Sequence, residues 1–358
     1  MSEQEILTID GSFGEGGGSI VRLGAGFSSL YGAPIELRNI RANRSKPGLR
    51  TQHLLGLHTL SKLTGSKLSE CKVGTEQLTF HPREKISDKI EVKINTAASL
   101  GLLLQPLQIA SLGFKEPSQI TIRLRGGGTF GKWAPSLNYL KNTTYKIFEQ
   151  AGLNIELEIK KQGFYPKGGA NVVCTLYPPQ KELKPIHLTK LGTIKAIKGE
   201  IILTEHLKGK NIPQRIEKSL TDHLRQQIEI SPQITSKYVN SLSAGVGFSV
   251  WGESDTGAII STGTIIGERH IASEKLGENA AKILTKYLRN DIPVDNYLSD
   301  QLIPLMAYNK QSSEIKVLEV TSHAQTNLDL IKKFTGRDYK ITKEKNHSLI
   351  QYKEHSPR

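Results

Sequence analysis

Residues 9–22 read Ile-Asp-Gly-Ser-Phe-Gly-Glu-Gly-Gly-Gly-Ser-Ile-Val-Arg and connect a short apolar run to a run with helical spacing. Five glycines and Glu15 share this turn. Glycine lets a backbone approach a ligand closely, and the N–H groups at a helix start favour an anion. The stretch therefore predicts a phosphate site for a nucleotide or a polyphosphate, although glycine-rich turns before helices also serve purely structural purposes.

The helix-like run after this loop begins a pattern that recurs along the chain. Each copy consists of a run with helical spacing, a glycine and an alternating segment that is typical of a strand. The three copies cover residues 19–37, 97–124 and 135–159. This recurrence predicts an α+β fold of three repeated units, in which helices pack on sheets.

The pattern changes between residues 185 and 277, after a connector that contains Pro178-Pro179. Within this segment, strand, helix, strand and strand patterns follow one another. A chain of 358 residues also exceeds the usual size of one domain. We therefore expect a main α+β domain from residues 1–184 and 278–358, and a smaller inserted α+β domain at 185–277.

The net charge of +14 and the pI near 9.5 favour a polyanionic partner, RNA or DNA. A generic lysine-rich surface is the alternative. No apolar run is long enough to span a membrane, and the acidic start at residues 1–5 is unlike a signal peptide. These features predict a cytoplasmic protein that has no membrane partner.

A second candidate phosphate site is the segment 40–53, where four cations surround a Pro-Gly turn. The planar fork of arginine suits bidentate contacts with phosphate, and a rigid turn fixes where such forks point. A solvated basic loop is the alternative. Its nearness in sequence to the glycine loop and to Arg22 favours phosphate binding.

Polar residues near the C-terminus form further candidates. His323 stands between a strand pattern and a helix pattern, where an imidazole could meet a phosphate, although most histidines are surface or packed residues. Asp300 and Gln301 begin a helix-like run and could cap it or bind a ligand. The glycine loop lacks the Lys-Ser or Lys-Thr of a P-loop, and no clustered histidines, cysteines or carboxylates indicate a structural metal.

Taken together, five separated motifs resemble those of the RNA 3′-terminal phosphate cyclases. They follow the family's order over nearly the whole chain, and this combination is specific where the glycine loop alone is not. The motifs are residues 10–22, 40–53, 163–166 and 297–301, and the His-x-x-Thr-Asn pattern of 323–327.

The resemblance implies an ATP-dependent reaction in three steps. A histidine attacks the α-phosphate of ATP, AMP passes to the RNA 3′-phosphate, and the neighbouring 2′-hydroxyl closes a 2′,3′-cyclic phosphate. Such displacements need a neutral imidazole, cations on the phosphate oxygens and strict placement. By carry-over, His323 is implied as the adenylylated nucleophile, and Glu15 as a ligand for magnesium or manganese.

The resemblance also implies two groups of binding residues and an architecture. The residues implied for the RNA terminal phosphate or the departing pyrophosphate are Arg22, Arg41, Arg44 and Gln52. The residues implied near the nucleotide are Gln105, Pro135, Tyr297, Asp300 and Gln301. The implied fold is a large domain of three repeated units, resembling the C-terminal domain of a bacterial translation initiation factor, with a smaller inserted domain, and a homodimer is expected.

Four positions depart from the family's pattern. The family usually has Arg or His in place of Gln162, glycine in place of Asn43 and Ala170, and an apolar residue in place of Gln325. Asn43 and Ala170 put the backbone of their turns in question because glycine is freer than either residue. None of the four departures removes a reacting group.

Two other functions remain open. Relatives in ribosome assembly share the fold without the reactive histidine, and the presence of His323 favours the enzyme. A plain RNA-binding module without turnover is the second alternative, which the charge does not exclude.

Overall fold

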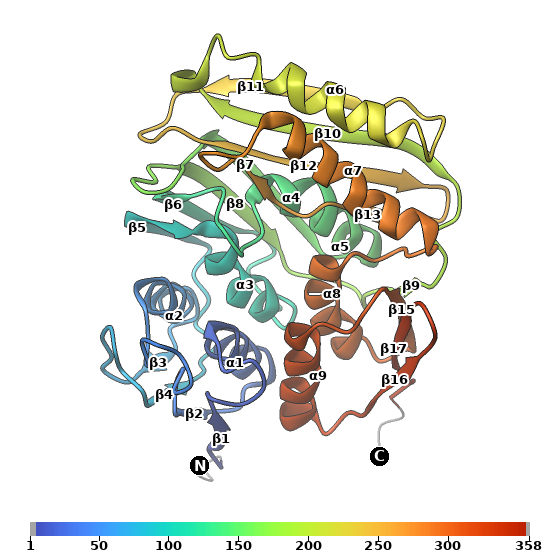
Figure 1. Cartoon of the computed structure of the whole chain (residues 1–358). Coiled ribbons are helices and arrows are strands. Elements are labelled where there is room, and N and C mark those ends of the chain that lie inside the picture. The colour runs from blue at the N-terminus through green and yellow to red at the C-terminus, as the bar shows by residue number, and fades with distance from the viewer. Residues whose placement is uncertain (1–4, 356–358) are drawn as a thin grey trace.

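The computed structural model describes residues 5–355, and its strands form four sheets (Figure 1). Three of the sheets have four strands each and one shared topology, in which the first two strands are parallel and the other pairs are antiparallel. Their spatial order is first, second, fourth, third. The fourth sheet has five strands and a different order. The fold is therefore a repeated α+β unit with one additional unit.

The first unit contains the glycine-rich loop. Its elements are β1 (Leu7–Asp10), α1 (Gly18–Tyr31), β2 (Ile35–Arg38), α2 (Thr51–Thr64), β3 (Lys67–Leu68) and β4 (Leu78–His81). Helix α1 is buried along most of its length and ends at Gly32, whose left-handed φ of 67° closes the last turn. The glycine stop predicted from the sequence is thus confirmed.

The second unit repeats this order with a broken second helix. Its elements are β5 (Lys89–Ser99), α3 (Leu100–Ser111), β6 (Ile120–Gly128), α4 (Leu137–Tyr139), the π-helical turn η1 (Leu140–Thr144), α5 (Tyr145–Ala151), β7 (Asn154–Lys161) and β8 (Asn171–Tyr177). Helix α3 begins later than the helical spacing from residue 97 predicts. Strand β5 continues to Ser99, whose hydroxyl then caps α3 by accepting from the N–H of Leu102.

The third unit is discontinuous in sequence. Its elements are β9 (His187–Leu188), α8 (Asn296–Tyr308), β15 (Ser313–Val317), α9 (Ser322–Thr335), β16 (Tyr339–Lys343) and β17 (Ser348–Tyr352). Strand β9 pairs in parallel with β15, and this pair matches the first two strands of the other units. The first strand and the first helix of this unit are separated by residues 189–295.

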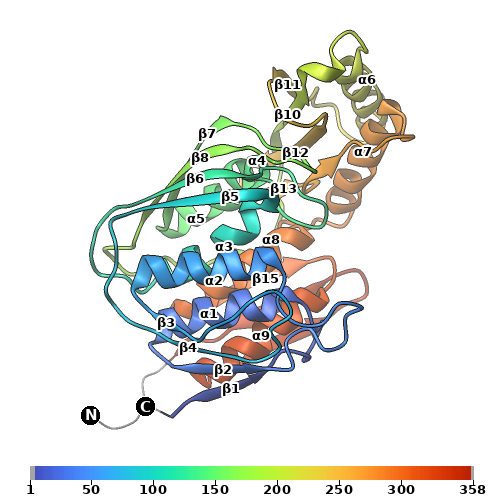
Figure 2. The same ribbon diagram turned by 90° about the vertical axis from the view of Figure 1, so that its left-hand side faces the viewer.

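The additional unit fills that gap. Its elements are β10 (Ile194–Thr204), the 3₁₀ turn η2 (Glu205–Leu207), α6 (Ile212–Leu224), β11 (Gln233–Val239), β12 (Val246–Ser254), β13 (Ile259–Ser261), β14 (Ile265–Ile266) and α7 (Ser273–Arg289). Helix α6 packs against α7, and both cover one face of the sheet (Figures 1 and 2). The domain boundaries at residues 185 and 277 stay a prediction. Near the first boundary, β9 pairs with β15 of the third unit, and at the second, α7 continues across residue 277.

The predicted allocation of residues to repeats is wrong, although the number of repeats is three. The copies at 97–124 and 135–159 are two halves of the second unit, because every unit contains two helix–strand passes. The real third unit was missed because the additional unit interrupts it after a strand of two residues.

Helix packing brings the first and third units together. Helix α1 packs against α2, α3 and α9, and α8 packs against α9. The loop before α1 contacts the first part of α9, because the N–H of Glu15 donates to the hydroxyl of Thr326. One apolar core extends through all four units. Within residues 5–355, no helix has both the length and the apolar character needed to cross a bilayer. The acidic start, apart from Glu5, lies outside the described residues.

Candidate active site

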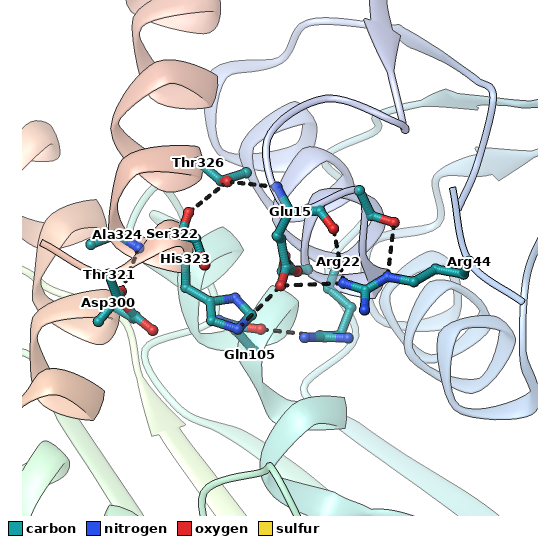
Figure 3. A network of polar contacts seen from close by, with 12 residues as sticks. Glu15, Arg22, Arg44, Gln105, Asp300, Thr321, Ser322, His323, Ala324 and Thr326 are labelled. Atoms are coloured by element: carbon teal, nitrogen blue, oxygen red, sulfur yellow. Dashed lines mark hydrogen bonds and ion pairs between the residues drawn. The ribbon is translucent and has the colours of Figure 1, made fainter. Parts of the chain in front are cut away.

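The glycine-rich loop between β1 and α1 contacts helix α9 directly (Figure 3). Gly14 has a left-handed φ of 59°, and a Cβ at this position would collide with the hydroxyl of Thr326. That hydroxyl donates to the carbonyl of Ser322 at 2.7 Å and accepts from the N–H of Glu15 at 3.4 Å. Glycine at residue 14 therefore permits the approach that carries Glu15 to α9.

The Glu15 carboxylate lies between a histidine and an arginine. Its Oε2 is 3.2 Å from Nε2 of His323 and 3.7 Å from Nη2 of Arg44, and its Oε1 accepts from the hydroxyl of Ser19. The Glu15 side chain is mostly buried, whereas the His323 side chain is half exposed. The imidazole is thus open to a ligand on one side and in contact with a carboxylate on the other.

His323 lies in the first turn of α9, inside the helix, whereas the sequence predicts it between a strand and the start of a helix. Thr321 is the N-cap, and its hydroxyl accepts from the N–H of Ala324 at 2.9 Å. The start of a helix carries partial positive charge and N–H groups that attract anions. The local field at His323 therefore favours a phosphate.

Arg22 is a buried cation next to this space. Its Nε donates to Oε1 of Gln105 at 3.1 Å, and within residues 5–355 its terminal nitrogens have no protein hydrogen-bond partner. Burial lowers the pKa of Arg22 to about 10, and the negative charge of Glu15 acts in the opposite direction. The guanidinium therefore stays charged at neutral pH. A buried charge without a bonded carboxylate favours an anionic ligand.

The other predicted phosphate ligands differ in which protein groups their side chains contact. Arg44 donates from Nη2 to the carbonyl of Glu15 at 2.8 Å and so joins the glycine loop. Arg41 is tied to its own loop, because Nε donates to the carbonyl of Gly48 at 3.1 Å. Gln52 lies in the first turn of α2, and its side chain forms no hydrogen bond within residues 5–355. Arg44 therefore lies beside Glu15, whereas Arg41 is held back from it by its loop.

Asp300 lies behind the start of α9. Its Oδ1 accepts from the hydroxyl of Thr321 at 2.9 Å, and its carbonyl accepts from Nδ2 of Asn327 at 2.9 Å. Burial raises the pKa of Asp300 to about 7, and the charges of Glu15 and Asp295 act in the same direction. Asp300 thus supports the helix that carries His323 and is electrostatically linked to Glu15.

Tyr297 and Pro135 are linked through the loop that contains Gly263 and Thr264. The Tyr297 ring is 54% exposed, and a Cβ on Gly263 would collide with it. The neighbouring Thr264 accepts from the N–H of Ser136, the residue after Pro135, at 2.8 Å. An exposed aromatic ring next to a proline offers a flat apolar surface of the kind that a base can stack on.

Gln301, which was also predicted to lie near the nucleotide, contacts α3 through its side chain. Its Oε1 accepts from Nε2 of Gln108 at 2.9 Å, and Gln108 in turn accepts from the hydroxyl of Tyr145 at 3.1 Å. The side-chain oxygen of Gln301 is therefore engaged in the contact between α8 and α3.

The four departures from the family's pattern have local explanations. Neither Asn43 nor Ala170 has a positive φ, so glycine is not required at either position. Gln325 donates to Oδ2 of Asp329 at 3.0 Å and to the hydroxyl of Tyr339 at 2.7 Å, which satisfies its amide. Gln162 lies outside this site and is treated below.

Three hydroxyls were missed as candidates, namely those of Ser19, Thr321 and Thr326. For Ser19 and Thr326 the sequence contained a signal, namely a polar partner four residues earlier at a helix start. These partners are Glu15 for Ser19 and Ser322 for Thr326. The contact of Thr326 with the glycine loop had no local signal, because the two lie 311 residues apart.

Comparison with known proteins identifies a family for the chain as a whole. The family model described as RNA 3′-terminal phosphate cyclase matches residues 13–341. This range includes the glycine loop, both segments that carry the arginines, and the start of α9.

Curated proteins with the same description match over almost their full length. The chain is 35% identical to the RNA 3′-terminal phosphate cyclase of Thermococcus gammatolerans, with 95% of each chain covered. It is 36% identical to that of Thermococcus onnurineus, with coverage of 95% of this chain and 96% of the relative. For Archaeoglobus fulgidus the identity is 32%, with coverage of 94% and 98%.

Proposed function

This chain belongs to the RNA 3′-terminal phosphate cyclase family, and we propose that it converts an RNA 3′-terminal phosphate to a 2′,3′-cyclic phosphate at the expense of ATP. The observation that carries the proposal is the position of His323 in the first turn of α9, 3.2 Å from Glu15. The buried Arg22 and the exposed Arg44 lie on the other side of Glu15 (Figure 3). A nucleophile thus faces cations that suit phosphate oxygens.

The proposed reaction balances in three displacements. A nitrogen of His323 attacks the α-phosphorus of ATP, so that a P–N bond forms, the bond to the bridging oxygen breaks and pyrophosphate leaves. An oxygen of the RNA 3′-phosphate then attacks the same phosphorus and breaks the P–N bond. Finally the 2′-oxygen attacks the 3′-phosphorus, loses its proton and expels AMP.

The geometry of His323 supports the first step. Attack requires a free lone pair, and Nε2 is the ring nitrogen that faces Glu15 and Arg44 in Figure 3. The neutral imidazole provides the lone pair, and the N-terminus of α9 stabilises the negative charge of an incoming phosphate. For Nε2 to attack, the ring proton must be on Nδ1 and the Glu15 carboxylate must release Nε2; a second cation on Glu15 would favour that release.

A divalent metal is the cation that fits Glu15. Magnesium binds proteins through one or two carboxylates together with substrate phosphates, and Glu15 offers one oriented carboxylate. Within residues 5–355, no group of three potential metal-ligating side chains is present, which argues for a metal held partly by ATP. When bound, such a metal would neutralise charge on the phosphate oxygens.

The first test uses ATP labelled at the α-phosphate, with magnesium or manganese. The wild-type protein should acquire the label through an acid-labile bond. His323→Ala should lower labelling by more than about 10³-fold, because no other group replaces the nucleophile. His58→Ala, at an exposed position on α2, is the matched control and should label normally.

Two results would contradict the proposal. Label that survives His323→Ala would remove the nucleophile assignment. A wild-type protein that binds RNA and never acquires label would indicate a ribosome-assembly relative or an RNA-binding module.

The second test separates the two phosphates that the arginines could bind. We expect RNA that ends in a 3′-phosphate to be cyclised and RNA that ends in a 3′-hydroxyl to be left unchanged. Arg44→Ala should weaken the RNA step by about 10–100-fold, since a charge-assisted phosphate contact is lost, and should preserve labelling by ATP. If labelling falls instead, Arg44 acts on the departing pyrophosphate. Arg83→Ala, at an exposed arginine after β4, is the control.

Two further proposals are a cytoplasmic location, which rests on the sequence features given above, and a homodimer, which rests on family membership. Sedimentation of the purified protein at several concentrations tests the second: a mass of one chain at all concentrations would contradict it.

A further inference from the structure

A large polar cleft separates the inserted sheet from the second unit. Its volume is about 890 Å³. One wall is the face of β10 and β11 that is opposite helices α6 and α7, and the other consists of α4, η1 and the end of β7 (Figure 2). None of the residues considered for the reaction lines it. The cleft is within the size range of ligand sites in proteins.

One residue that lines the cleft, Gln162, has an unpaired hydrogen-bond acceptor. The Glu200 carboxylate can only accept hydrogen bonds, and Nδ2 of Asn138 donates to its Oε2 at 2.6 Å. The Asn138 oxygen Oδ1 then accepts from Nε2 of Gln162 at 3.3 Å. With these donor and acceptor assignments, Oε1 of Gln162 is buried and has no protein hydrogen-bond partner within residues 5–355. Gln162 is 7% exposed. A buried acceptor of this kind calls for a donor from a ligand.

The rim of the cleft is positively charged. Five lysines line it, whereas Glu200 is the acidic lining residue. Two of the lysines are paired with carboxylates, Lys160 with Glu158 and Lys198 with Glu253. The other three have no carboxylate within 4.0 Å among residues 5–355, and these are Lys141, Lys161 and Lys237. A ligand that fits must carry negative charges as well as a hydrogen-bond donor.

The cleft and the candidate active site are connected through α4. Asn138 lines the cleft, and the next residue, Tyr139, donates to Oδ1 of Asp295 at 3.0 Å. The ring of Tyr139 lies 6.3 Å from that of Tyr297 in edge contact. One short helix thus contacts the edge of the active site on one side and the cleft on the other.

We propose that this cleft binds nucleotides of the RNA strand upstream of its 3′ end, with Lys141, Lys161 and Lys237 on the phosphates and Oε1 of Gln162 accepting from a base or ribose hydroxyl. A single strand offers both requirements, since each nucleotide carries one negative charge and several donors. Trp251, which pairs with Lys198, adds an aromatic side chain to the same wall. The inference rests on the proposed function in taking RNA as the ligand.

The experiment compares two RNAs that end in a 3′-phosphate, a dinucleotide and a strand of about twelve nucleotides, the latter long enough to occupy a typical single-strand site. Binding is measured by fluorescence anisotropy over a series of KCl concentrations. The cleft variant carries Lys141→Gln, Lys161→Gln and Lys237→Gln. The control carries Lys115→Gln, Lys181→Gln and Lys286→Gln, three exposed lysines outside the cleft, and has the same net charge.

For the long strand, the cleft variant should lose affinity, and the slope of log K against log salt should flatten by about 0.7 for each lost phosphate contact, or about 2 in all. The dinucleotide should bind both variants as it binds the wild type. A long strand that keeps its wild-type slope in the cleft variant, or an equal loss in the control variant, would overturn the inference. So would equal losses for the short and long RNAs.

The proposed function can fail independently. Labelling by ATP requires no RNA, so a protein that never becomes labelled contradicts the cyclase proposal. In that case the salt dependence of binding of the long strand still tests whether the cleft binds RNA.

Discussion

At the scale of single residues, Asp300 links the charge of the site to its pH response. The carboxyl is partly buried beneath Thr321 and shares its surroundings with Glu15 and Asp295. Its pKa rises from the usual 3.8 to about 7. Near neutral pH the folded protein therefore holds Asp300 as a mixture of the neutral acid and the carboxylate.

This shift predicts that Asp300 makes the fold less stable as pH rises. Well below pH 3.8 the carboxyl is neutral in both states, so it adds no penalty. Between the unfolded pKa of 3.8 and the folded pKa of about 7, the unfolded chain releases the proton first, which favours unfolding. The penalty grows to at most about 4 kcal/mol above pH 7, at 1.36 kcal/mol for each pKa unit.

Chemical unfolding of wild type and Asp300→Asn at a series of pH values measures this effect. The two proteins should have similar stability near pH 4, and the variant should become the more stable one as pH rises to 7, because asparagine does not ionise. A constant difference between them across this range would show that Asp300 does not titrate as its surroundings imply.

The sequence predicted the residue types of the site better than their partners. Glu15, Arg44 and His323 were all expected near phosphate. Their mutual contacts depend on the packing of α1 against α9, which no local pattern encodes. The partner of Gln301 was also not predictable from local sequence. Gln301 was expected to lie near a nucleotide, and its side-chain oxygen accepts a hydrogen bond from Gln108 in α3.

At the scale of elements, the start of α1 is set by a close approach to α2. Gly18 is the first residue of α1, and a Cβ there would collide with the ring of His53 in α2. His53 accepts from the N–H of Arg50 through Nδ1 at 3.0 Å, and burial, followed by the charges of nearby arginines such as Arg22, lowers its pKa to about 3. A neutral, fixed imidazole therefore packs against the helix start.

We expect opposite effects from two glycine substitutions in α1. Gly18→Ala should destabilise the fold by about 1–3 kcal/mol, because the buried ring cannot move freely. Gly24→Ala should stabilise it by up to about 1 kcal/mol, since a Cβ there meets only ordinary contacts, beginning with Ile9 at 3.5 Å, and alanine favours a helix. Urea unfolding measures both, and equal midpoints for the two variants would contradict the packing argument.

Sequence patterns predicted most helices within a few residues, because apolar spacing and glycine stops are local signals. They missed β11, whose residues are largely exposed and polar on the face toward the cleft. They also predicted only two strands after the helix of the segment 185–277, because β13 and β14 read as one strand; the chain breaks between them at residues 262–264, where Gly263 has a φ of 68°. Strand partners are distant in sequence, so such breaks carry little local signal.

At the scale of the whole molecule, an insertion between β9 and α8 of the third unit adds the five-stranded sheet without changing that unit's topology. The joint between the insertion and the second unit is a small apolar cluster of Phe130, Phe164 and Ile202. The two phenylalanine rings stack with centroids 5.2 Å apart. Ile202 belongs both to this joint and to the lining of the cleft, so we expect the joint to influence the width of the cleft.

Two glycines of β12 test whether that joint holds the insertion. A Cβ on Gly247 would collide with the ring of Phe130, whereas a Cβ on Gly252 would meet Ile194 at an ordinary 3.4 Å. Gly247→Ala should therefore destabilise the protein by about 1–3 kcal/mol, and Gly252→Ala should change its stability by less than about 1 kcal/mol. Urea unfolding measures the difference. Because the clash pushes the sheet away from the second unit, Gly247→Ala should also weaken binding of the long RNA while ATP still labels His323. Equal stability and equal RNA affinity for the two variants would mean that the joint does not control the cleft.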